Sequence, residues 1–214
     1  MKKFSCPSCG AEILFKSSAT VFGVCSFCQA TLVRRDVNIE AIGKMAELPS
    51  DLSPFQVGSQ GTFEGKNFEI IGRVKVGWDD GMWNEWYCTF QDGKNAWLVE
   101  AQGFVSLCFE LEQSSIPPRQ NLHLRFEVKI PNRESFFVDD IKDTICLGSE
   151  GELPFQAPQR KTGTTIDLSN SKGTFASIEY NENESRIFIG KYTSPKELKM
   201  KNLREIEGWP KWMA

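Results

Sequence analysis

Four cysteines near the start of the chain have the spacing of metal ligands. They form two C-x2-C pairs with fifteen residues between the pairs, and they are Cys6, Cys9, Cys25 and Cys28. Cysteines two residues apart turn both sulfurs inward from one tight knuckle, and two knuckles supply the four thiolates that tetrahedral Zn²⁺ prefers. A pair of disulfides is the alternative, but this spacing is more typical of zinc. Because four sulfurs close the coordination shell, we expect the zinc ion to be structural.

The remaining residues offer no convincing catalytic set, so no catalytic residue is predicted. The single histidine, His123, alternates with apolar residues, and we expect it on the solvated face of a strand with no nucleophile to activate. Cys88, Cys108 and Cys146 lie in apolar segments without a neighbouring base, which is typical of buried free thiols in a reducing compartment. Neither of the common glycine-rich phosphate-binding motifs is present.

Tryptophans are concentrated in one short part of the chain. Trp86 and Trp97 share strand faces with other apolar residues, so we expect them in the core. Trp78 and Trp83 flank the turn-forming residues 79–81, where an aromatic side chain is a candidate hot spot for a binding partner. We therefore take Trp78 and Trp83 as candidate partner-binding residues, with packing against the core as an equal alternative.

The elements around the cysteines are short. Segments 12–15, 19–24 and 30–34 are β-prone and separated by polar residues, which predicts a small hairpin and one further strand. Strands of this size cannot bury a core, so the metal must supply much of the folding free energy. We interpret residues 1–36 as a zinc ribbon.

Residues 37–54 are predicted to be a short helix and a linker. Ile39, Ile42 and Met45 fall at helical spacing, and Pro49 and Pro54 supply stop signals. The domain boundary is expected in this segment.

From residue 55 to residue 214 the pattern is that of an antiparallel β domain, either a sheet or a barrel. Asp92 and Gly93 form a strong hairpin signal between segments 85–90 and 95–101, and apolar residues alternate along segment 122–130. The glycine-containing segment 148–154 has the composition of a loop.

Two short patterns predict further features of this domain, a C-terminal helix and an internal repeat. Ser194 and Glu197 have the spacing of a capping box with proline at the first helical position, which predicts a short C-terminal helix as far as about Lys201. The sequence Gly-Thr-Phe occurs at residues 61–63 and again at 173–175, so two related β subunits are an alternative to one domain.

Charge and hydropathy limit the classes of partner. Residues 1–36 carry five basic and two acidic side chains, a net charge of plus three, so the rest of the chain carries minus six of the total of minus three. This balance disfavours nucleic-acid binding by the large domain and leaves the ribbon as a candidate. No apolar run approaches the ~20 residues needed to span a bilayer, and no signal peptide is evident. We expect a cytoplasmic protein.

The chain resembles bacterial proteins that carry an N-terminal zinc ribbon before a domain of unknown function, the family numbered 4178. The resemblance covers most of residues 37–205, and the tryptophan-rich segments are its most specific part. The segments that carry it are 57–61, 68–73, 83–87, 96–103 and 151–154. It implies a β-rich bacterial domain with no established activity, loosely associated with membrane-stress and polyamine-related genes, and it provides no catalytic residues.

From these observations we expect a non-catalytic binding or adaptor protein. The zinc ribbon would position the β domain against a protein partner, in a bacterial envelope-stress setting. Two alternatives stay open. One is nucleic-acid binding through the basic ribbon, and the other is an enzyme for a small or peptidic substrate, which would require a deep pocket with several convergent polar groups.

Overall fold

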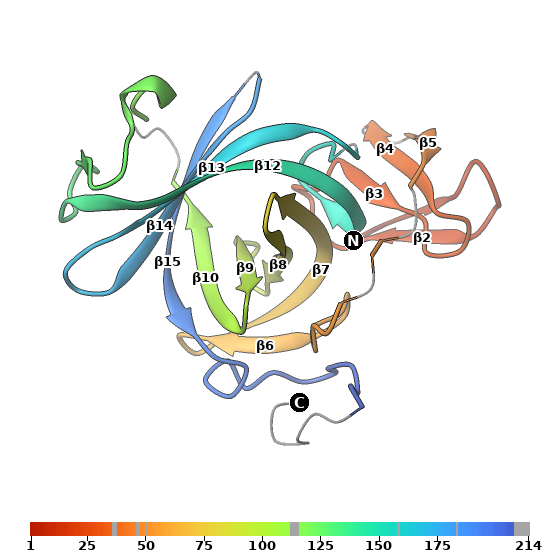
Figure 1. Cartoon of the computed structure of the whole chain (residues 1–214). Coiled ribbons are helices and arrows are strands. Elements are labelled where there is room, and N and C mark those ends of the chain that lie inside the picture. Colours follow the sequence, from red (N-terminus) through yellow and green to blue (C-terminus); the bar gives the residue numbers. More distant parts are fainter. Residues whose placement is uncertain are drawn as a thin grey trace.

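A computed structural model describes residues 1–35, 38–45, 48–49, 51–111, 116–157, 159–182 and 184–207. The regular secondary structure of these residues is β, as Figure 1 shows, apart from a single 3-10 turn at Arg119–Asn121, and the described ranges contain no α-helix. The part of the chain that the structure describes therefore has no helix long and apolar enough to cross a membrane.

Eight antiparallel strands close into a barrel made of two four-stranded meanders. The first meander comprises β7 (Lys66–Trp78), β8 (Gly81–Phe90), β9 (Asn95–Ala101) and β10 (Phe104–Glu110). The second comprises β12 (Phe136–Leu153), β13 (Thr162–Ser169), β14 (Thr174–Tyr180) and β15 (Ser185–Thr193). Pairing of β10 with β15 and of β12 with β7 closes the circle. The prediction of a mainly β, barrel-like domain is confirmed.

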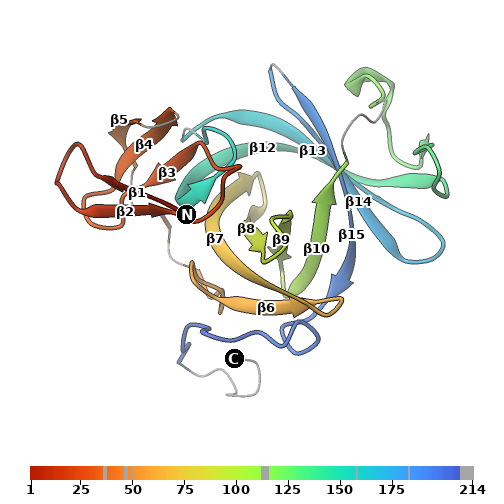
Figure 2. The same cartoon turned by 180° about the vertical axis from the view of Figure 1, so that it is seen from behind.

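The ribbon is joined to the barrel through a shared sheet, as the view from behind in Figure 2 shows. Its strands are β1 (Lys2–Ser5), β2 (Glu12–Phe15), β3 (Phe22–Val24), β4 (Ala30–Arg35) and β5 (Asn38–Lys44). Strands β1 and β2 form a separate hairpin, whereas β3 pairs with the last two residues of β12. Two short strands complete the sheet: β6 (Gln60–Phe63) pairs with β7, and β11 (Glu127–Val128) pairs with β12.

Strand β12 passes so close to β7 that only glycine fits at the contact. A Cβ atom added to Gly72 would lie 2.0 Å from the carbonyl oxygen of Glu152, and one added to Gly151 would lie 2.3 Å from that of Ile71. Gly151 also has a φ of +68°, which L side chains rarely adopt. The prediction of a loop at 148–154 is therefore wrong, since these glycines allow β12 to run on from the barrel into the ribbon.

The short helix predicted within residues 37–54 is also wrong. Residues Asn38–Lys44 form strand β5, which pairs with β4 along its whole length. Three apolar residues were too few to distinguish a helix from an edge strand, and backbone pairing with β4 decided the outcome. The positions of residues 36, 37, 46, 47 and 50 lie outside the described residues.

The predicted C-terminal helix is not present either. The capping contact does form, because the Glu197 amide donates to Ser194 Oγ at 3.2 Å. Lys199 and Asn202 then adopt positive φ values of 49° and 56°, which a right-handed helix cannot continue through. The segment stays a series of turns that places Leu198, which is buried, against the outside of the barrel.

The alternation in segment 122–130 predicted a strand that is formed only in part. Glu127 and Val128 pair with β12, but Arg125 has a φ of 65° and breaks the segment before them. Leu122, Val128 and Ile130 are buried as predicted, but Leu124 is 59% exposed, so the predicted apolar face is confirmed only in part.

The alternative of two related β subunits does not match the observed topology. Both meanders belong to one closed barrel. The repeated tripeptides occupy unequal places, because Gly61 lies in β6 outside the barrel circle and Gly173 lies in the turn before β14.

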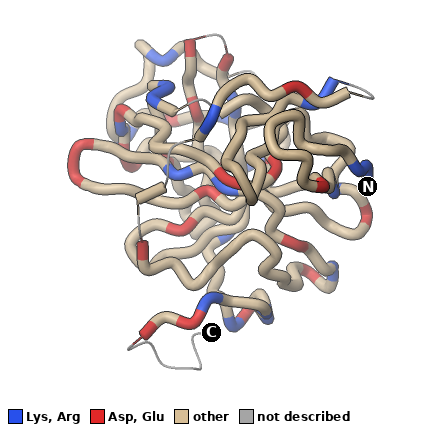
Figure 3. Tube along the Cα trace, turned by 90° about the vertical axis from the view of Figure 1, so that its right-hand side faces the viewer, with Lys and Arg blue, Asp and Glu red and all other residues tan. Residues whose placement is uncertain are grey.

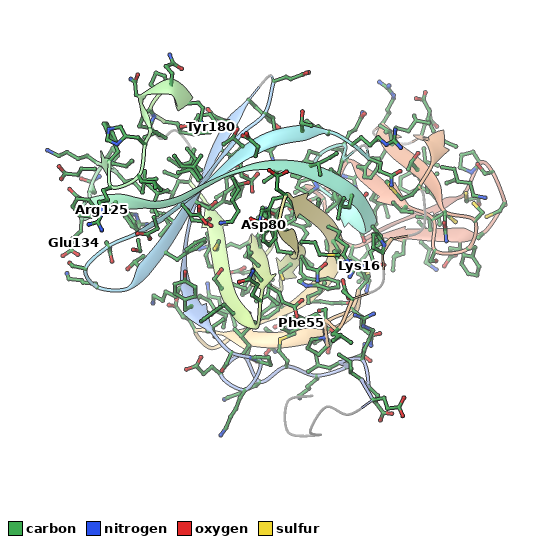
Figure 4. All side chains as sticks on the ribbon, viewed as in Figure 1. Lys16, Phe55, Asp80, Arg125, Glu134 and Tyr180 are labelled. Atoms are coloured by element: carbon green, nitrogen blue, oxygen red, sulfur yellow. The ribbon has the colours of Figure 1, made fainter. Side chains whose placement is uncertain are left out.

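Two apolar clusters pack against opposite faces of the first meander. Trp86 is fully buried on its outer face with Phe55, which Figure 4 labels next to β6, and Trp97 is 6% exposed on its inner face. The expected core positions of both tryptophans are confirmed. The linker is fastened to the outside by Asp51, whose carboxylate accepts from Lys75 Nζ at 2.7 Å and Arg204 Nη2 at 2.8 Å.

The contact between β7 and β12 generates a stability prediction. We expect Gly72→Ala to destabilise the fold by more than about 2 kcal/mol, because the added methyl group meets rigid backbone and one strand must shift. Urea unfolding followed by far-UV circular dichroism measures this loss. Gly43→Ala in β5 is the matched control, since its Cβ would meet only the Thr31 hydroxyl at 3.1 Å. Equal effects of the two substitutions would contradict the close-passage argument.

Candidate functional site

The four cysteines of the two knuckles converge as a metal site requires. Their sulfur atoms all lie within 4.8 Å of one another, and none of the four is in a disulfide. Each knuckle closes in the same way, with Gly10 N donating to Cys6 O at 2.8 Å and Gln29 N donating to Cys25 O at 2.9 Å. The cluster can hold a metal ion, and its donor set of four thiolates matches a closed tetrahedral site.

Most basic side chains of the ribbon are engaged by acceptors of the chain itself. Lys3 pairs with Glu12, Lys16 with Glu69, and Arg35 with Glu40. Arg34 donates to the carbonyl oxygens of Ser17 and Ser18. Figure 3 shows basic and acidic residues interspersed along the tube, not separated into one basic face.

A buried carboxylate joins the ribbon to the barrel. Glu152, near the end of β12, accepts from the Lys16 amide at 2.7 Å, from the Ser17 amide at 3.3 Å and from Thr20 Oγ1 at 2.8 Å. Burial raises the pKa of Glu152, and these donors oppose that shift. Lys16, labelled in Figure 4, lies at this junction, so the ribbon is held at a defined position on the barrel.

The barrel encloses a cavity of about 450 Å³. Because side chains alternate in direction along a strand, every second residue of the barrel strands faces this space. Aromatic and aliphatic side chains make most of the wall: Trp78, Trp83, Trp97, Val99, Ala101, Phe104, Phe175, Phe188 and Tyr192. The polar and ionisable groups among them include Glu85, Ser106, Cys108, Lys142, Asp167, Ser177 and Glu179.

The two candidate binding tryptophans lie in the wall of this cavity. The ring centroids of Trp78 and Trp83 are 5.1 Å apart, and Trp83 is only 8% exposed. Trp83 Nε1 donates to Glu85 Oε1 at 2.7 Å. The structure thus brings Trp78 and Trp83 together, but inside the barrel mouth and not on an exposed loop.

Three carboxyl groups from three strands face the cavity. Burial raises the pKa of Glu85 to about 7, and the charge of Asp167 adds to this shift against the Trp83 hydrogen bond. Burial, reinforced by repulsion from Glu85, raises the pKa of Glu179 well above its ordinary value. Burial likewise raises the pKa of Asp167, while the ammonium of Lys142 opposes the shift. The surroundings of these three carboxyl groups therefore favour their protonated forms.

A single ammonium group faces the same space near the mouth. Lys142 Nζ lies 3.7 Å from Asp167 Oδ2 and also pairs with Asp140. The same nitrogen lies 6.0 Å from the centroid of the Trp78 ring. Lys142 therefore pairs with Asp140 and Asp167, and in the part of the chain that the structure describes neither Glu85 nor Glu179 forms an ion pair.

The other residues singled out from the sequence lie apart from any reactive arrangement. His123 is exposed and its ring packs against Phe126 at 5.3 Å. Burial raises the pKa of Cys88, raises that of Cys108 to about 12 and raises that of Cys146 to about 11. A thiol with a raised pKa is a poor nucleophile, so these three cysteines have no activated thiolate.

Sequence analysis did not predict that these three carboxyl groups line a cavity. A signal was available, because Asp167 lies between Ile166 and Leu168 and Glu179 between Ile178 and Tyr180. An acidic residue between apolar ones is usually read as the solvated face of a strand. In a closed barrel that face can point into the lumen instead.

A comparison with protein-family models matches the part of the chain that forms the barrel. A model described as "Domain of unknown function (DUF4178)" matches residues 56–195, about two thirds of the chain. The chain belongs to the DUF4178 family. The match begins after the ribbon and extends from β6 through β15, so the DUF4178 domain contains the whole barrel and its cavity. Comparisons with curated proteins and with solved structures gave no match.

The half-buried carboxyl group of Glu85 makes the stability of the DUF4178 domain depend on pH. Its folded-state pKa of about 7 lies above the ordinary value of 4.5, so its stabilising contribution is complete below about pH 4.5 and is lost as the pH rises through 7. We expect Glu85→Gln to reduce the loss of stability between pH 4.5 and pH 8 by about 3 kcal/mol. Urea unfolding of the wild type and of Glu85→Gln at pH 4.5 and at pH 8 measures this difference in stability. Glu134→Gln, at an exposed carboxylate, should keep the wild-type profile, and a wild-type profile in Glu85→Gln would refute the assignment.

Proposed function

We propose that this protein is a non-catalytic binding protein, in which the barrel takes up a small organic molecule and the ribbon contacts a protein partner. The observation that carries this proposal is the cavity itself. A volume of about 450 Å³ lies within the range of small-molecule sites, and its walls are mainly apolar with a few polar groups. Such walls bury a ligand, and the polar groups orient it.

An enzymatic role receives less support from the same cavity. The cavity has the depth and the convergent polar groups that an enzyme would need. Among the described residues, however, no hydroxyl or thiol in it is hydrogen-bonded to a histidine or a lysine. Ser106 contacts Cys108 at 3.7 Å, and the pKa of that thiol is raised, not lowered. Binding is the activity that these groups support best.

Nucleic-acid binding through the ribbon is also less well supported. Lys3, Lys16, Arg34 and Arg35 already have acceptors within the chain. A protein contact suits the ribbon better, because Phe27 at the tip of the second knuckle is 74% exposed. Since Glu152 holds the ribbon to β12, a partner on the ribbon would be placed close to the barrel.

The metal in the ribbon is, in this proposal, a structural zinc ion. Four thiolates are the preferred ligands of Zn²⁺, and a closed shell leaves no position for a substrate. Reduced cysteines fit the cytoplasm, which we propose as the setting of the protein, with a bacterial source as the family resemblance implies.

Metal content tests the first part of this proposal. We expect one zinc ion per purified chain, and we expect Cys25→Ser to lose that ion and to lower the melting temperature of the ribbon, because metal binding is coupled to folding. Elemental analysis and thermal unfolding measure the two effects. Cys146→Ser, outside the knuckles, should retain the metal. A chain that is metal-free yet folds unchanged would contradict a structural zinc site.

Uptake of a neutral fluorophore tests the cavity. N-phenyl-1-naphthylamine should gain fluorescence with the full chain, and Trp78→Ala should weaken its binding about tenfold because an aromatic contact is lost. Ala101→Trp, which places an indole in the cavity, should abolish binding. Phe137→Ala is the control, since Phe137 is 46% exposed and does not line the cavity. Wild-type binding by Ala101→Trp would mean that the probe binds elsewhere.

A further inference from the structure

We propose that the ligand of the barrel is an organic cation, with an ammonium or guanidinium group on an apolar body, whose charge is received by Glu85 and Glu179. This inference rests on the proposed binding role of the cavity and names the chemical class of its ligand. It follows from three features of the wall: uncompensated carboxyl groups, aromatic faces and the absence of a converging metal site among the described residues.

The charges that line the cavity are unbalanced. Three carboxyl groups line it against a single ammonium group, Lys142, which lies with Asp167 and Asp140. Glu85 accepts one hydrogen bond, from the Trp83 indole, and has no ion pair. Within the described residues Glu179 has neither a hydrogen bond nor an ion pair. These two groups come from β8 and β14, so they face each other across the lumen.

The charge of Arg186 partly opposes the raised pKa of Glu179, but Arg186 forms its ion pairs with Glu110 and Glu184. Arg186, the residue paired with Glu179 across the β14–β15 ladder, donates to Glu184 at 3.0 Å and stacks over Phe155 at 4.5 Å. A half-buried carboxyl group without a hydrogen-bond partner is costly, and the raised pKa of Glu179 reflects that cost. A ligand cation would provide the missing partner for both glutamates.

The aromatic wall suits the same kind of ligand. Trp78, Trp83 and Trp97 all line the cavity, and indole faces attract ammonium and guanidinium groups. The chain contains one such arrangement already, because Lys142 Nζ lies over the Trp78 ring with carboxylates beside it. A cationic ligand would repeat this combination of aromatic face and carboxylate deeper in the barrel.

A bare metal ion does not fit the cavity equally well. Three or more potential ligand atoms come together only at the four cysteines, in so far as the chain is described. The carboxyl groups of the cavity are therefore too dispersed to coordinate one metal ion, whereas an organic cation can reach separate groups. An anionic ligand would add a negative charge beside two glutamates.

Protons compete with the cation for these carboxyl groups. The ionisable groups around Glu85 and Glu179 come from most of the surrounding strands and loops, whereas β7 and β9 line this space with apolar residues. They are Cys108, Glu110, Lys142, Cys146, Lys161, Asp167, Glu184 and Arg186. A cation binds the ionised carboxylates, so binding releases protons and must strengthen as the pH rises through the raised pKa values.

Three molecules with one skeleton and different charges test the inference. Isothermal titration of the full chain would compare 3-phenylpropylamine, 3-phenylpropan-1-ol and 3-phenylpropanoate. We expect the amine to bind about tenfold more tightly than the alcohol, because hydrogen bonds to charged groups contribute more than neutral ones, and the carboxylate to bind most weakly. The affinity of the amine, and not that of the alcohol, should rise between about pH 6 and pH 8.

Matched variants assign the effect to the two glutamates. Glu85→Gln and Glu179→Gln should each reduce the preference for the amine over the alcohol to about threefold or less, whereas Glu134→Gln on the outer surface should leave it unchanged. Lys142→Gln provides a variant with both glutamates intact, and it should strengthen binding of the amine because it removes a competing cation.

The outcomes separate this inference from the proposed function. Equal binding of alcohol and amine, or an unchanged preference in both glutamate variants, would overturn the choice of a cation and leave ligand binding in place. If none of the three molecules binds, and N-phenyl-1-naphthylamine does not bind either, both proposals fail.

Discussion

The structure depends on the close passage of β12 over β7. This eighteen-residue strand pairs with β13 on one side and with β7 on the other, which closes the barrel, and its last residues pair with β3 of the ribbon. Two glycines, Gly72 and Gly151, make the passage sterically feasible. One strand therefore sets the shape of the cavity and the position of the ribbon together.

Closure of the barrel changes the environment of the polar face of each strand. In an open antiparallel sheet the polar face of each strand contacts water, so acidic residues there carry little cost. In this barrel the same alternation directs Glu85, Asp167 and Glu179 into a lumen lined by aromatic rings. The carboxyl groups lose hydration without gaining enough partners, which raises their pKa values. A cost to stability of this kind is typical of sites that bind ligands.

The ribbon and the barrel are stabilised by different means. The ribbon has short strands around four convergent sulfurs, and a small cluster of Cys6, Cys25, Ala30 and Leu32 is its buried centre. The barrel uses apolar clusters on both faces of its strands, with Trp97 inside and Trp86 outside. The ribbon contacts the barrel through backbone pairing of β3 with β12 and through hydrogen bonds to the buried carboxylate of Glu152. None of these contacts is made by the side chains of the four cysteines.

Some features of this protein were determined by the sequence alone. Each C-x2-C pair is a local pattern of four residues, and two such pairs together are typical of one metal site. The convergence of Cys6, Cys9, Cys25 and Cys28 could therefore be predicted. The β content and the burial of Trp86 follow from alternation along single strands, which is likewise local.

Other features were decided only by the tertiary structure. Strand β5 replaced a predicted helix because β4 offered backbone partners, and segment 148–153 became strand because β7 lay beside it. The cavity and the carboxyl groups that line it come together only because β12 and β15 return to pair with β7 and β10. These pairings join residues far apart in the chain, and no local pattern of residue types specifies which strands will meet.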